Sequence, residues 1–313
     1  MASTLPTAWF EGFEARDFEV NGTSIFARYG GNVAGPALLL LHGFPQSHVM
    51  WHRVVQALQA RYFIVLPDLR GYGDSSKVAG LPDHSNYSKR NMAQDALSVM
   101  DMLGRDRFYV CGHDRGGRVA HRLALDHPGR VHKLCLIDIA PTLDMYNATD
   151  MQFATAYYHW FHLIQPSPLP ETMIGGNALP YLHAKLGGWG SQGLSYIEAE
   201  ALLEYERCFC TPEAIHAACE DYRASAGIDL VHDRDSRAQG EKIVCDTQVL
   251  WGERGVVHKL FNPLALWQAQ CAGIVSGQSL PAGHFIPEEL PLETAHALAQ
   301  FFAAEETEGP PAT

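Results

Sequence analysis

The feature that most constrains the fold of this chain is the pentapeptide Gly112-His113-Asp114-Arg115-Gly116, which has the G-x-S-x-G spacing of a nucleophile elbow with aspartate in place of serine. The five residues before it, 107–111, are mostly apolar and predict a short buried strand. After it, apolar residues recur at helical spacing over 118–127 and end before Pro128. A nucleophile elbow requires this order of strand, tight turn and helix, so the context favours an elbow over a simple aspartate N-cap.

An aspartate at this position changes the chemistry that an elbow can perform. A serine that attacks a saturated carbon would form an ether, which the same machinery could not release. The carboxylate of Asp114 would instead form an ester with that carbon. Water can then hydrolyse this ester at the aspartyl carbonyl. The pattern therefore predicts a substitution at carbon followed by hydrolysis of an ester.

Length and net charge limit the other possibilities. A chain of 313 residues can bury a large core in one or two domains. The net charge of -12, with histidine neutral, argues against nucleic acid or an anionic membrane as a partner, because both require a basic surface. It does not exclude an anionic small-molecule substrate, because a few arginines can override the net charge inside a cleft.

The N-terminal segment 1–20 has neither the basic nor the apolar region of a secretion signal, and no run approaches the ~20 apolar residues of a membrane span. We therefore expect a soluble, cytoplasmic protein. The seven cysteines form no C-x-x-C framework, which favours buried free thiols over disulfides or a zinc site. We expect no metal and no other cofactor.

Strand-like and helical segments alternate along most of the chain. The predicted strands are 24–27, 37–41, 63–66, 108–111, 133–139, 248–251 and 274–280. The predicted helices are 51–60, 88–103, 118–127, 263–271 and 292–303. This alternation predicts an α/β fold in which helices cover both faces of a mostly parallel sheet.

The alternation stops between about Leu143 and Ile228. This segment is rich in aromatic residues, helical in pattern, and interrupted by a Pro-rich stretch at 165–170. We predict an inserted helical cap over the C-terminal edge of the sheet. The predicted domains are 1–142 (first part of the core), 143–228 (cap) and 229–313 (second part of the core). The acidic and Pro-rich tail 305–313 is expected to be frayed.

Several short motifs together make the chain resemble the fluoroacetate (haloacetate) dehalogenases of the α/β-hydrolase superfamily. Two of them, His42-Gly43-Phe44-Pro45 and the elbow, are shared widely across that fold. The Asp-Arg-x-x-Arg pattern at 114–118 and the His159-Trp160 pair are the more specific part. Asp221-Tyr222-Arg223 and Gly283-His284-Phe285 extend the resemblance over nearly the whole chain.

The resemblance implies the α/β-hydrolase fold, a homodimer, and roles for eight side chains. The catalytic residues would be Asp114 as nucleophile, His284 as base for the hydrolytic water, and Asp138 as the acid that orients His284. The residues that hold the substrate carboxylate would be Arg115 and Arg118. The residues that line the halide pocket would be His159, Trp160 and Tyr222.

Arg115 and Arg118 also stand out by their own chemistry. They lie three residues apart at the start of a predicted helix, so they share a face. The helix dipole disfavours a cation there by ~0.3 to 1 kcal/mol, so two cations beside a nucleophile indicate a function. Two guanidinium groups can converge on one carboxylate. The alternative is that each arginine pairs with a structural acid.

His284 follows the last predicted strand, and we expect it to be neutral near pH 7 so that it can accept a proton from water. Asp138 and Glu253 are both candidates for the acid that orients it, because either satisfies the chain order of nucleophile, acid and histidine. We favour Asp138, because a carboxylate within the apolar run 136–141 needs a partner.

The backbone N–H groups of Phe44 and Arg115 are the candidates for an oxyanion hole in ester hydrolysis. His42 is interpreted as a structural residue of the same loop as Phe44. His48 and His52 have an i, i+4 spacing that can bind a metal, but no acidic third ligand is nearby. We therefore expect this pair at a solvated helix start.

Two functions can use this machinery. Displacement of halide from a 2-haloacid such as fluoroacetate or chloroacetate would give glycolate. An epoxide hydrolase would use the same Asp114 and His284 and would need two cap tyrosines, for which the cap offers several candidates. The paired arginines favour the haloacid, and a non-catalytic receptor would be expected to lose nucleophile, base or acid. The preferred halide, the substrate size and the oligomeric state stay open.

Overall fold

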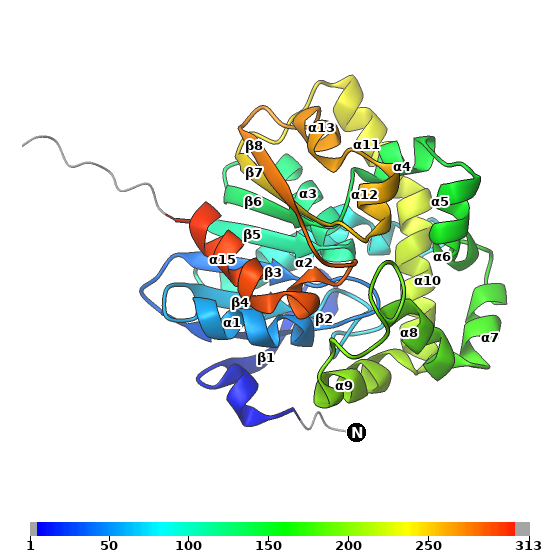
Figure 1. Ribbon diagram of the computed structural model, residues 1–313, viewed down its shortest axis with the longest axis horizontal. Helices are drawn as coiled ribbons and strands as arrows, with labels where there is room; N and C mark the ends of the chain where they lie inside the picture. The colour runs from blue at the N-terminus through cyan, green and yellow to red at the C-terminus, as the bar shows by residue number, and fades with distance from the viewer. Residues whose placement is uncertain (1–4, 304–313) are drawn as a thin grey trace, which may run out of the picture.

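An eight-stranded sheet runs through the centre of the molecule (Figure 1). The computed structural model describes residues 5–303. The strands are β1 (Glu14–Val20), β2 (Thr23–Gly31), β3 (Ala37–Leu41), β4 (Phe63–Pro67), β5 (Phe108–His113), β6 (Val131–Ile137), β7 (Asp246–Gly252) and β8 (Val275–Leu280). Their order in the sheet is β1-β2-β4-β3-β5-β6-β7-β8. The β1–β2 and β2–β4 pairs are antiparallel and the other pairs are parallel, so the predicted mostly parallel α/β sheet is confirmed.

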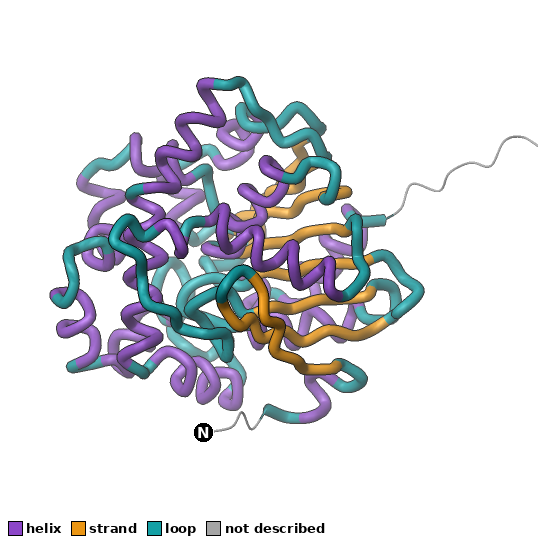
Figure 2. Tube along the Cα trace, turned by 180° about the vertical axis from the view of Figure 1, so that it is seen from behind, coloured by secondary structure: helices purple, strands orange, loops and turns teal. Residues whose placement is uncertain are grey.

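Helices cover both faces of this sheet. The face toward the viewer in Figure 1 carries α1 (His52–Leu58) and α15 (Pro291–Phe301), which pack against each other. The opposite face, seen in Figure 2, carries α2 (Lys89–Met102) and α3 (Arg115–Asp126), which also pack together. The other helices outside the region between β6 and β7 are α12 (Val256–Leu260), α13 (Pro263–Gln268), α14 (Ile286–Glu289) and the 3-10 helices η1 (Thr7–Phe10), η2 (His48–Trp51) and η3 (Ser85–Tyr87).

The chain between β6 and β7 contains helices and, within the described residues, no strand. These helices are α4 (Thr142–Asn147), α5 (Met151–Ala156), α6 (Tyr158–Leu163), α7 (Leu169–Gly175), α8 (Ala178–Leu186), α9 (Ala199–Phe209), α10 (Pro212–Ala226) and α11 (Ile228–Ala238). Most of them gather at one end of the sheet, on the right in Figure 1. The helical segment continues to Ala238, beyond the predicted cap boundary at residue 228. The division into two core parts and a cap stays a prediction.

Burial explains which strands the sequence pattern revealed. Every residue of β3, β4 and β5 is buried, which accounts for the continuous apolar runs of these central strands. The sequence pattern did not predict β1, in which only Phe18 and Val20 are buried. This strand lies at the edge of the sheet and pairs only with β2, so its charged residues face solvent.

The helix α3 begins three residues earlier than predicted. It starts at Arg115, directly after Asp114, so Arg115 and Arg118 both lie at its beginning. The seven cysteines are free thiols; four are buried as predicted, and the other three are only partly buried. None of the helices within residues 5–303 combines the length and the hydropathy that a membrane span needs. The tail 305–313, which was expected to be frayed, lies outside the described residues.

Candidate active site

Asp114 occupies the turn between β5 and α3 in a conformation that non-glycine residues rarely adopt. Its φ is 49° and its ψ is -116°. Two glycines make room for this turn: a Cβ on Gly43 would lie 2.5 Å from Cβ of Asp114, and a Cβ on Gly116 would lie 2.3 Å from the carbonyl oxygen of His42. The side chain of Asp114 makes no capping hydrogen bond to α3. The alternative of a simple N-cap is therefore wrong.

The carboxylate of Asp114 faces the loop that follows β3. Its Oδ1 accepts a hydrogen bond from the backbone N–H of Phe44 at 2.9 Å. One of the two N–H groups expected for the oxyanion hole therefore touches this carboxylate. The other belongs to Arg115, the first residue of α3, whose N–H has no acceptor within the helix.

His284 comes from the loop after β8 and lies between two carboxylates. Its Nδ1 is 2.6 Å from Oδ2 of Asp138, and its Nε2 is 3.7 Å from Oδ2 of Asp114. Nε2 is buried and forms no hydrogen bond to any described residue. This nitrogen is therefore placed to act on a small molecule beside Asp114.

The two candidates for the orienting acid lie in different surroundings. Asp138 follows β6, and its Oδ1 accepts a hydrogen bond from the backbone N–H of Gly252 at 3.0 Å, while Oδ2 faces His284. Glu253 instead accepts a hydrogen bond from the hydroxyl of Ser279 at 3.0 Å in an exposed loop. The geometry brings Asp138, and not Glu253, to His284.

The charges of the site act on both reacting groups. Burial opposes the ionisation of Asp114, but the charges of His284 and of the neighbouring arginines bring the pKa of this carboxyl below its ordinary value. Burial also opposes the protonation of His284, but the hydrogen bond with Asp138 and the charges of Asp138 and Asp114 raise the pKa of the imidazole. The resting site therefore favours a protonated His284 more than the sequence analysis assumed. An ester on Asp114 would remove one of these negative charges and so favour the neutral base.

Arg115 is held by a carboxylate of α10. Its Nε lies 2.8 Å from Oδ2 of Asp221, and its Nη2 lies 2.7 Å from Oδ1 of the same side chain. Nη2 also donates to the hydroxyl of Ser225 at 2.6 Å. Nη1 is buried and has no hydrogen-bond partner among the described residues. Arg115 thus pairs with a structural acid through two nitrogens and keeps a third for a ligand.

Arg118 has neutral neighbours instead. Its Nη1 donates to the hydroxyl of Thr142 at 2.8 Å and to the carbonyl oxygen of Ala140 at 3.2 Å. Its Nε is buried with no hydrogen-bond partner within residues 5–303, and the whole residue is only 3% exposed. Burial, followed by the like charge of Arg115, lowers the pKa of Arg118. Arg118 forms no ion pair with a described carboxylate, and Asp114 offsets its charge only through space, so this buried position favours an additional anion.

Two of the three side chains expected around a halide lie beside Phe44, and the third, Trp160, packs against Tyr222 with ring centroids 6.5 Å apart. The ring centroids of His159 on α6 and Tyr222 on α10 are 5.5 Å apart, and they lie 5.9 and 5.4 Å from that of Phe44. The ring of Trp160, also on α6, lies 4.7 Å from the guanidinium of Arg118. Nδ1 of His159 and the hydroxyl of Tyr222 are buried and find no hydrogen-bond partner in the part of the chain that the structure describes.

Asp221 is a site residue to which the sequence analysis gave no role. It accepts a hydrogen bond from the hydroxyl of Tyr72 at 2.6 Å and forms ion pairs with both Lys89 and Arg115. Because the one carboxylate of Asp221 pairs with both Lys89 and Arg115, the electrostatic surroundings of Arg118 remain positive. The signal was its place beside Tyr222 in the motif, but a separation of 106 residues from Arg115 conceals the pairing.

Lys185 and Trp189 form the wall behind His159, and no sequence pattern pointed to them. The Nζ of Lys185 lies 5.6 Å from the ring centroid of Trp189, and burial lowers the pKa of this lysine to about 8. The ring of Trp189 lies 4.6 Å from that of His159 and 5.2 Å from that of His284. Trp189 therefore packs against both His159 and His284, and Lys185 adds a buried cation near His159.

The other histidines singled out from the sequence have structural contacts. Nε2 of His42 accepts a hydrogen bond from the backbone N–H of Leu69 at 2.9 Å, which fits its structural interpretation. His48 and His52 are buried, so the expected solvated helix start is wrong. Nδ1 of His48 lies 3.0 Å from Oδ1 of Asp68. Within residues 5–303 no group of three or more metal-ligating side chains is arranged to hold a metal ion.

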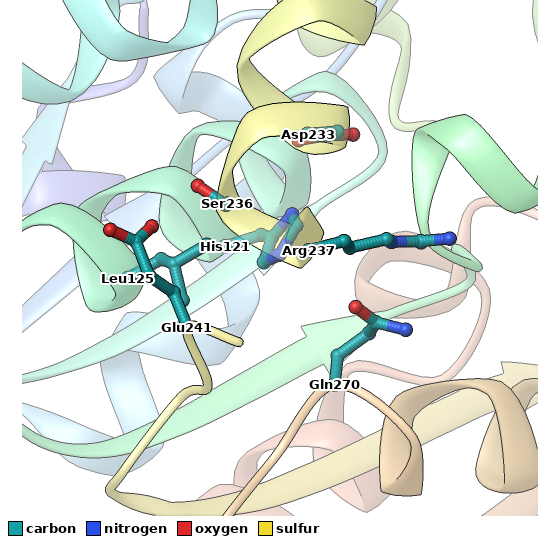
Figure 3. A pocket seen from close by; sticks show the side chains of 7 residues that line it. All are labelled: His121, Leu125, Asp233, Ser236, Arg237, Glu241 and Gln270. Atoms are coloured by element: carbon teal, nitrogen blue, oxygen red, sulfur yellow. The ribbon is translucent and has the colours of Figure 1, made fainter. Parts of the chain in front are cut away.

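A small pocket elsewhere, lined by both buried and exposed side chains, shares no residue with this site (Figure 3). Its lining residues are His121, Leu125, Asp233, Ser236, Arg237, Glu241 and Gln270. Leu125 lies near the far end of α3, on the order of 16 Å from Asp114 along a helix that rises ~1.5 Å per residue. The pocket is therefore separate from the candidate active site.

Comparison with known proteins places this chain in a family. The family model of the alpha/beta hydrolase fold matches residues 36–171. A fluoroacetate dehalogenase from Burkholderia sp. is 45% identical over 94% of this chain and 95% of its own length. A soluble epoxide hydrolase from Corynebacterium sp. (strain C12) is 30% identical over 86% of this chain and 91% of its own length. Among solved structures, an α/β-hydrolase-like protein from Nostoc sp. PCC 7120 aligns with a TM-score of 0.91 at 54% identity, covering 95% of this chain and 100% of that one.

The fold and these similarities show that the protein is an enzyme, a hydrolase. The chain belongs to the α/β-hydrolase superfamily and, within it, to the family of the fluoroacetate dehalogenases.

Proposed function

We propose that this protein hydrolyses small 2-haloacids, converting fluoroacetate or chloroacetate to glycolate and halide through an ester on Asp114. The observation that carries the proposal is Arg118, a buried guanidinium whose charge lowers the pKa of Asp114 and which has no ion-pair partner among the described residues. A substrate carboxylate supplies the missing ion-pair partner, and the unused Nη1 of Arg115 helps to hold it. The similarity to the Burkholderia fluoroacetate dehalogenase supports the same class of substrate.

The first step is a substitution at the halogen-bearing carbon. A carboxylate oxygen of Asp114 attacks this carbon while the carbon–halogen bond breaks, and the electron pair of that bond leaves with the halide. Arg115 and Arg118 fix the substrate carboxylate and so align the carbon with Asp114. The departing halide is received by three hydrogen-bond donors: His159, Trp160 and Tyr222.

The second step releases the product. Nε2 of His284 takes a proton from a water molecule, and the water oxygen attacks the carbonyl carbon of the ester. The N–H groups of Phe44 and Arg115 stabilise the oxyanion, while Asp138 stabilises the protonated imidazole. When the intermediate collapses, the alkoxide oxygen of glycolate takes the proton from His284. The second proton of the water remains on the Asp114 carboxyl group, whose lowered pKa favours its release to solvent, and this restores the carboxylate.

Epoxide hydrolysis is the competing function. The similarity to the Corynebacterium epoxide hydrolase and the buried, unpartnered hydroxyl of Tyr222 favour it, because such a hydroxyl can protonate an epoxide oxygen. A neutral epoxide, however, brings no charge to Arg118. Arg118, which has no ion-pair partner among the described residues, therefore favours the haloacid.

Product analysis distinguishes the two functions. We expect halide from fluoroacetate and from chloroacetate, and no diol from a neutral epoxide. The variant Arg118→Leu should lose several orders of magnitude in kcat/KM for both acids, because a misoriented carbon raises the energy of the transition state. Arg118→Lys keeps the charge without the fork and should lose less.

Two results would contradict the proposed haloacid hydrolysis. Diol from the epoxide without halide from either acid would reverse the assignment. An Arg118→Leu variant with normal haloacid kinetics would remove the argument from the carboxylate.

The proposal includes two properties of the whole protein. The family resemblance implies a homodimer, which light scattering of the purified protein tests. The free cysteines are typical of the reducing cytoplasm, and cell fractionation tests that location.

A further inference from the structure

His113, the residue directly before Asp114, makes an unusual contact for a side chain at the end of a central strand. It is fully buried, and its Nε2 lies 2.8 Å from the backbone carbonyl oxygen of His284. The two imidazole rings are 4.6 Å apart. Nδ1 of His113 is buried and has no hydrogen-bond partner within residues 5–303. The side chain therefore has one polar contact, and that contact is to the residue assigned as the base.

The chemistry of this contact fixes the state of the ring. Burial, followed by the charge of His284, lowers the pKa of His113 to about 3, so the ring is neutral at physiological pH. A carbonyl oxygen can only accept a hydrogen bond, so the proton of the neutral ring must be on Nε2. His113 is therefore a donor toward His284 and cannot act as a second base through Nε2.

The strand order explains why such a donor is needed. Asp114 follows β5 and His284 follows β8, and β6 and β7 lie between these strands in the sheet. Strands lie ~4.8 Å apart, so the loop that carries His284 must reach back across roughly 14 Å. The carboxylate of Glu289 accepts from the N–H groups of Gly283 and Phe285, at 2.7 and 3.1 Å, and so holds the residues on either side of His284.

Two hydrogen bonds fix different parts of His284 itself. Asp138 fixes the side chain through Nδ1, at 2.6 Å. His113 fixes the backbone through the carbonyl oxygen, at 2.8 Å. Because His113 and Asp114 are consecutive residues, this hydrogen bond ties the backbone of the base to the backbone of the nucleophile.

We propose that His113 is a positioning residue that holds Nε2 of His284 at the correct distance from the ester on Asp114. This inference rests on the two-step mechanism proposed above. In that mechanism the attack of Asp114 on the substrate does not use His284, whereas hydrolysis of the ester does. Loss of the hydrogen bond from His113 therefore slows the second step and leaves the first step nearly unchanged.

A matched pair of variants tests this role. His113→Gln places an amide N–H near the position of Nε2, whereas the shorter side chain of His113→Asn ends near Nδ1 and cannot reach the carbonyl oxygen. The variant His113→Asn should show a burst of about one halide per active site. Its later turnover should fall on the order of 100-fold, because a ~1 Å misplacement of the base costs about this much. The variant His113→Gln should keep most of the wild-type turnover. Mass spectrometry of the Asn variant during turnover should find the ester on the peptide that contains Asp114.

The variant His284→Asn separates this inference from the proposed function. If His284→Asn accumulates the ester and His113→Asn does not, the two-step mechanism stands and the positioning role is wrong. If His284→Asn turns over without forming any ester, the proposed mechanism itself is wrong. Equal losses in His113→Gln and His113→Asn, without an ester in either, would mean that His113 only fills space. Thermal unfolding of each variant confirms that the comparison is made on folded protein.

Discussion

Tyr222 shows at the scale of a single residue how a buried polar atom indicates a ligand. Its side chain is fully buried, and its hydroxyl has no hydrogen-bond partner among the described residues. Burial, followed by the negative charge of Asp114, raises the pKa of this phenol, so it stays protonated and able to donate. An unsatisfied buried hydroxyl costs ~1 to 3 kcal/mol, and a halide that leaves toward it would supply the acceptor.

This leads to a prediction about the preferred halide. Fluoride concentrates its charge more than chloride, so a donor aimed at the leaving group matters more for fluoroacetate. Tyr222→Phe should raise the barrier for fluoroacetate by ~2.7 to 4 kcal/mol, as for the loss of one oxyanion-hole donor, and lower chloroacetate turnover much less. Steady-state kinetics on both acids measure the difference.

Tyr62→Phe is the matched control for this prediction. It removes another buried hydroxyl that has no partner within residues 5–303, but from a tyrosine that packs against Tyr109 in the core. It should leave both turnover rates unchanged. Equal losses on the two acids in Tyr222→Phe would reduce Tyr222 to a residue that shapes the cavity.

At the scale of elements, Glu288 joins the segment after His284 to helix α9. It lies on α14, four residues after His284, and is 1% exposed. Its carboxyl group contacts the side-chain amide of Gln46, in the loop after β3, and the hydroxyl of Tyr205 on α9, the latter at 3.0 Å. Burial raises the pKa of Glu288 to about 8, so this group is protonated in the folded protein at neutral pH.

The raised pKa predicts how stability depends on pH. Between the ordinary value of 4.5 and about 8, the folded state binds a proton that the unfolded state has lost. Glu288 therefore makes the free energy of unfolding fall as pH rises through this window, by at most ~1.4 kcal/mol per pH unit. Glu288→Gln should flatten this dependence, as measured by denaturant unfolding at a series of pH values.

An exposed carboxylate is the control for Glu288. Glu253 lies in a solvent-exposed loop, and Glu253→Gln should keep the wild-type pH dependence. If Glu288→Gln keeps the wild-type slope as well, the carboxyl of Glu288 is ionised in the folded protein and another group sets the slope.

At the scale of the whole molecule, local patterns predicted the elements and could not predict their contacts. The apolar runs of the central strands fix the parallel sheet because both of its faces are covered. The edge strand β1 escaped notice because its exposed charges outnumber its two buried residues. The elbow revealed Asp114, since strand, turn and helix are contiguous there. The pairing of Arg115 with Asp221 spans 106 residues, and no local pattern records it.

The same limit explains the difference between the two arginines. Spacing alone does not distinguish Arg115 from Arg118, because both lie on one face of the helix. Only the fold brings Asp221 to the first and leaves the second among neutral groups. Only the tertiary structure therefore makes Arg118 an indicator of an anionic substrate.

The balance of charge over the molecule gives a last prediction. The chain has a net charge of -12, whereas the cations of the site are buried and partly compensated by Asp221, Asp114 and Asp138. A haloacetate anion that approaches from a distance therefore meets a repulsive field.

This repulsive field reaches ~30 Å at an ionic strength of 0.01 M and only ~10 Å at 0.1 M. We expect kcat/KM to rise between these two conditions, while kcat at saturating substrate changes little because the buried site is screened less. Steady-state kinetics in two salts with different anions separate this screening from competition by one particular anion. A fall of kcat/KM in both salts would mean that the arginines of the site, and not the net charge, govern the approach of the substrate.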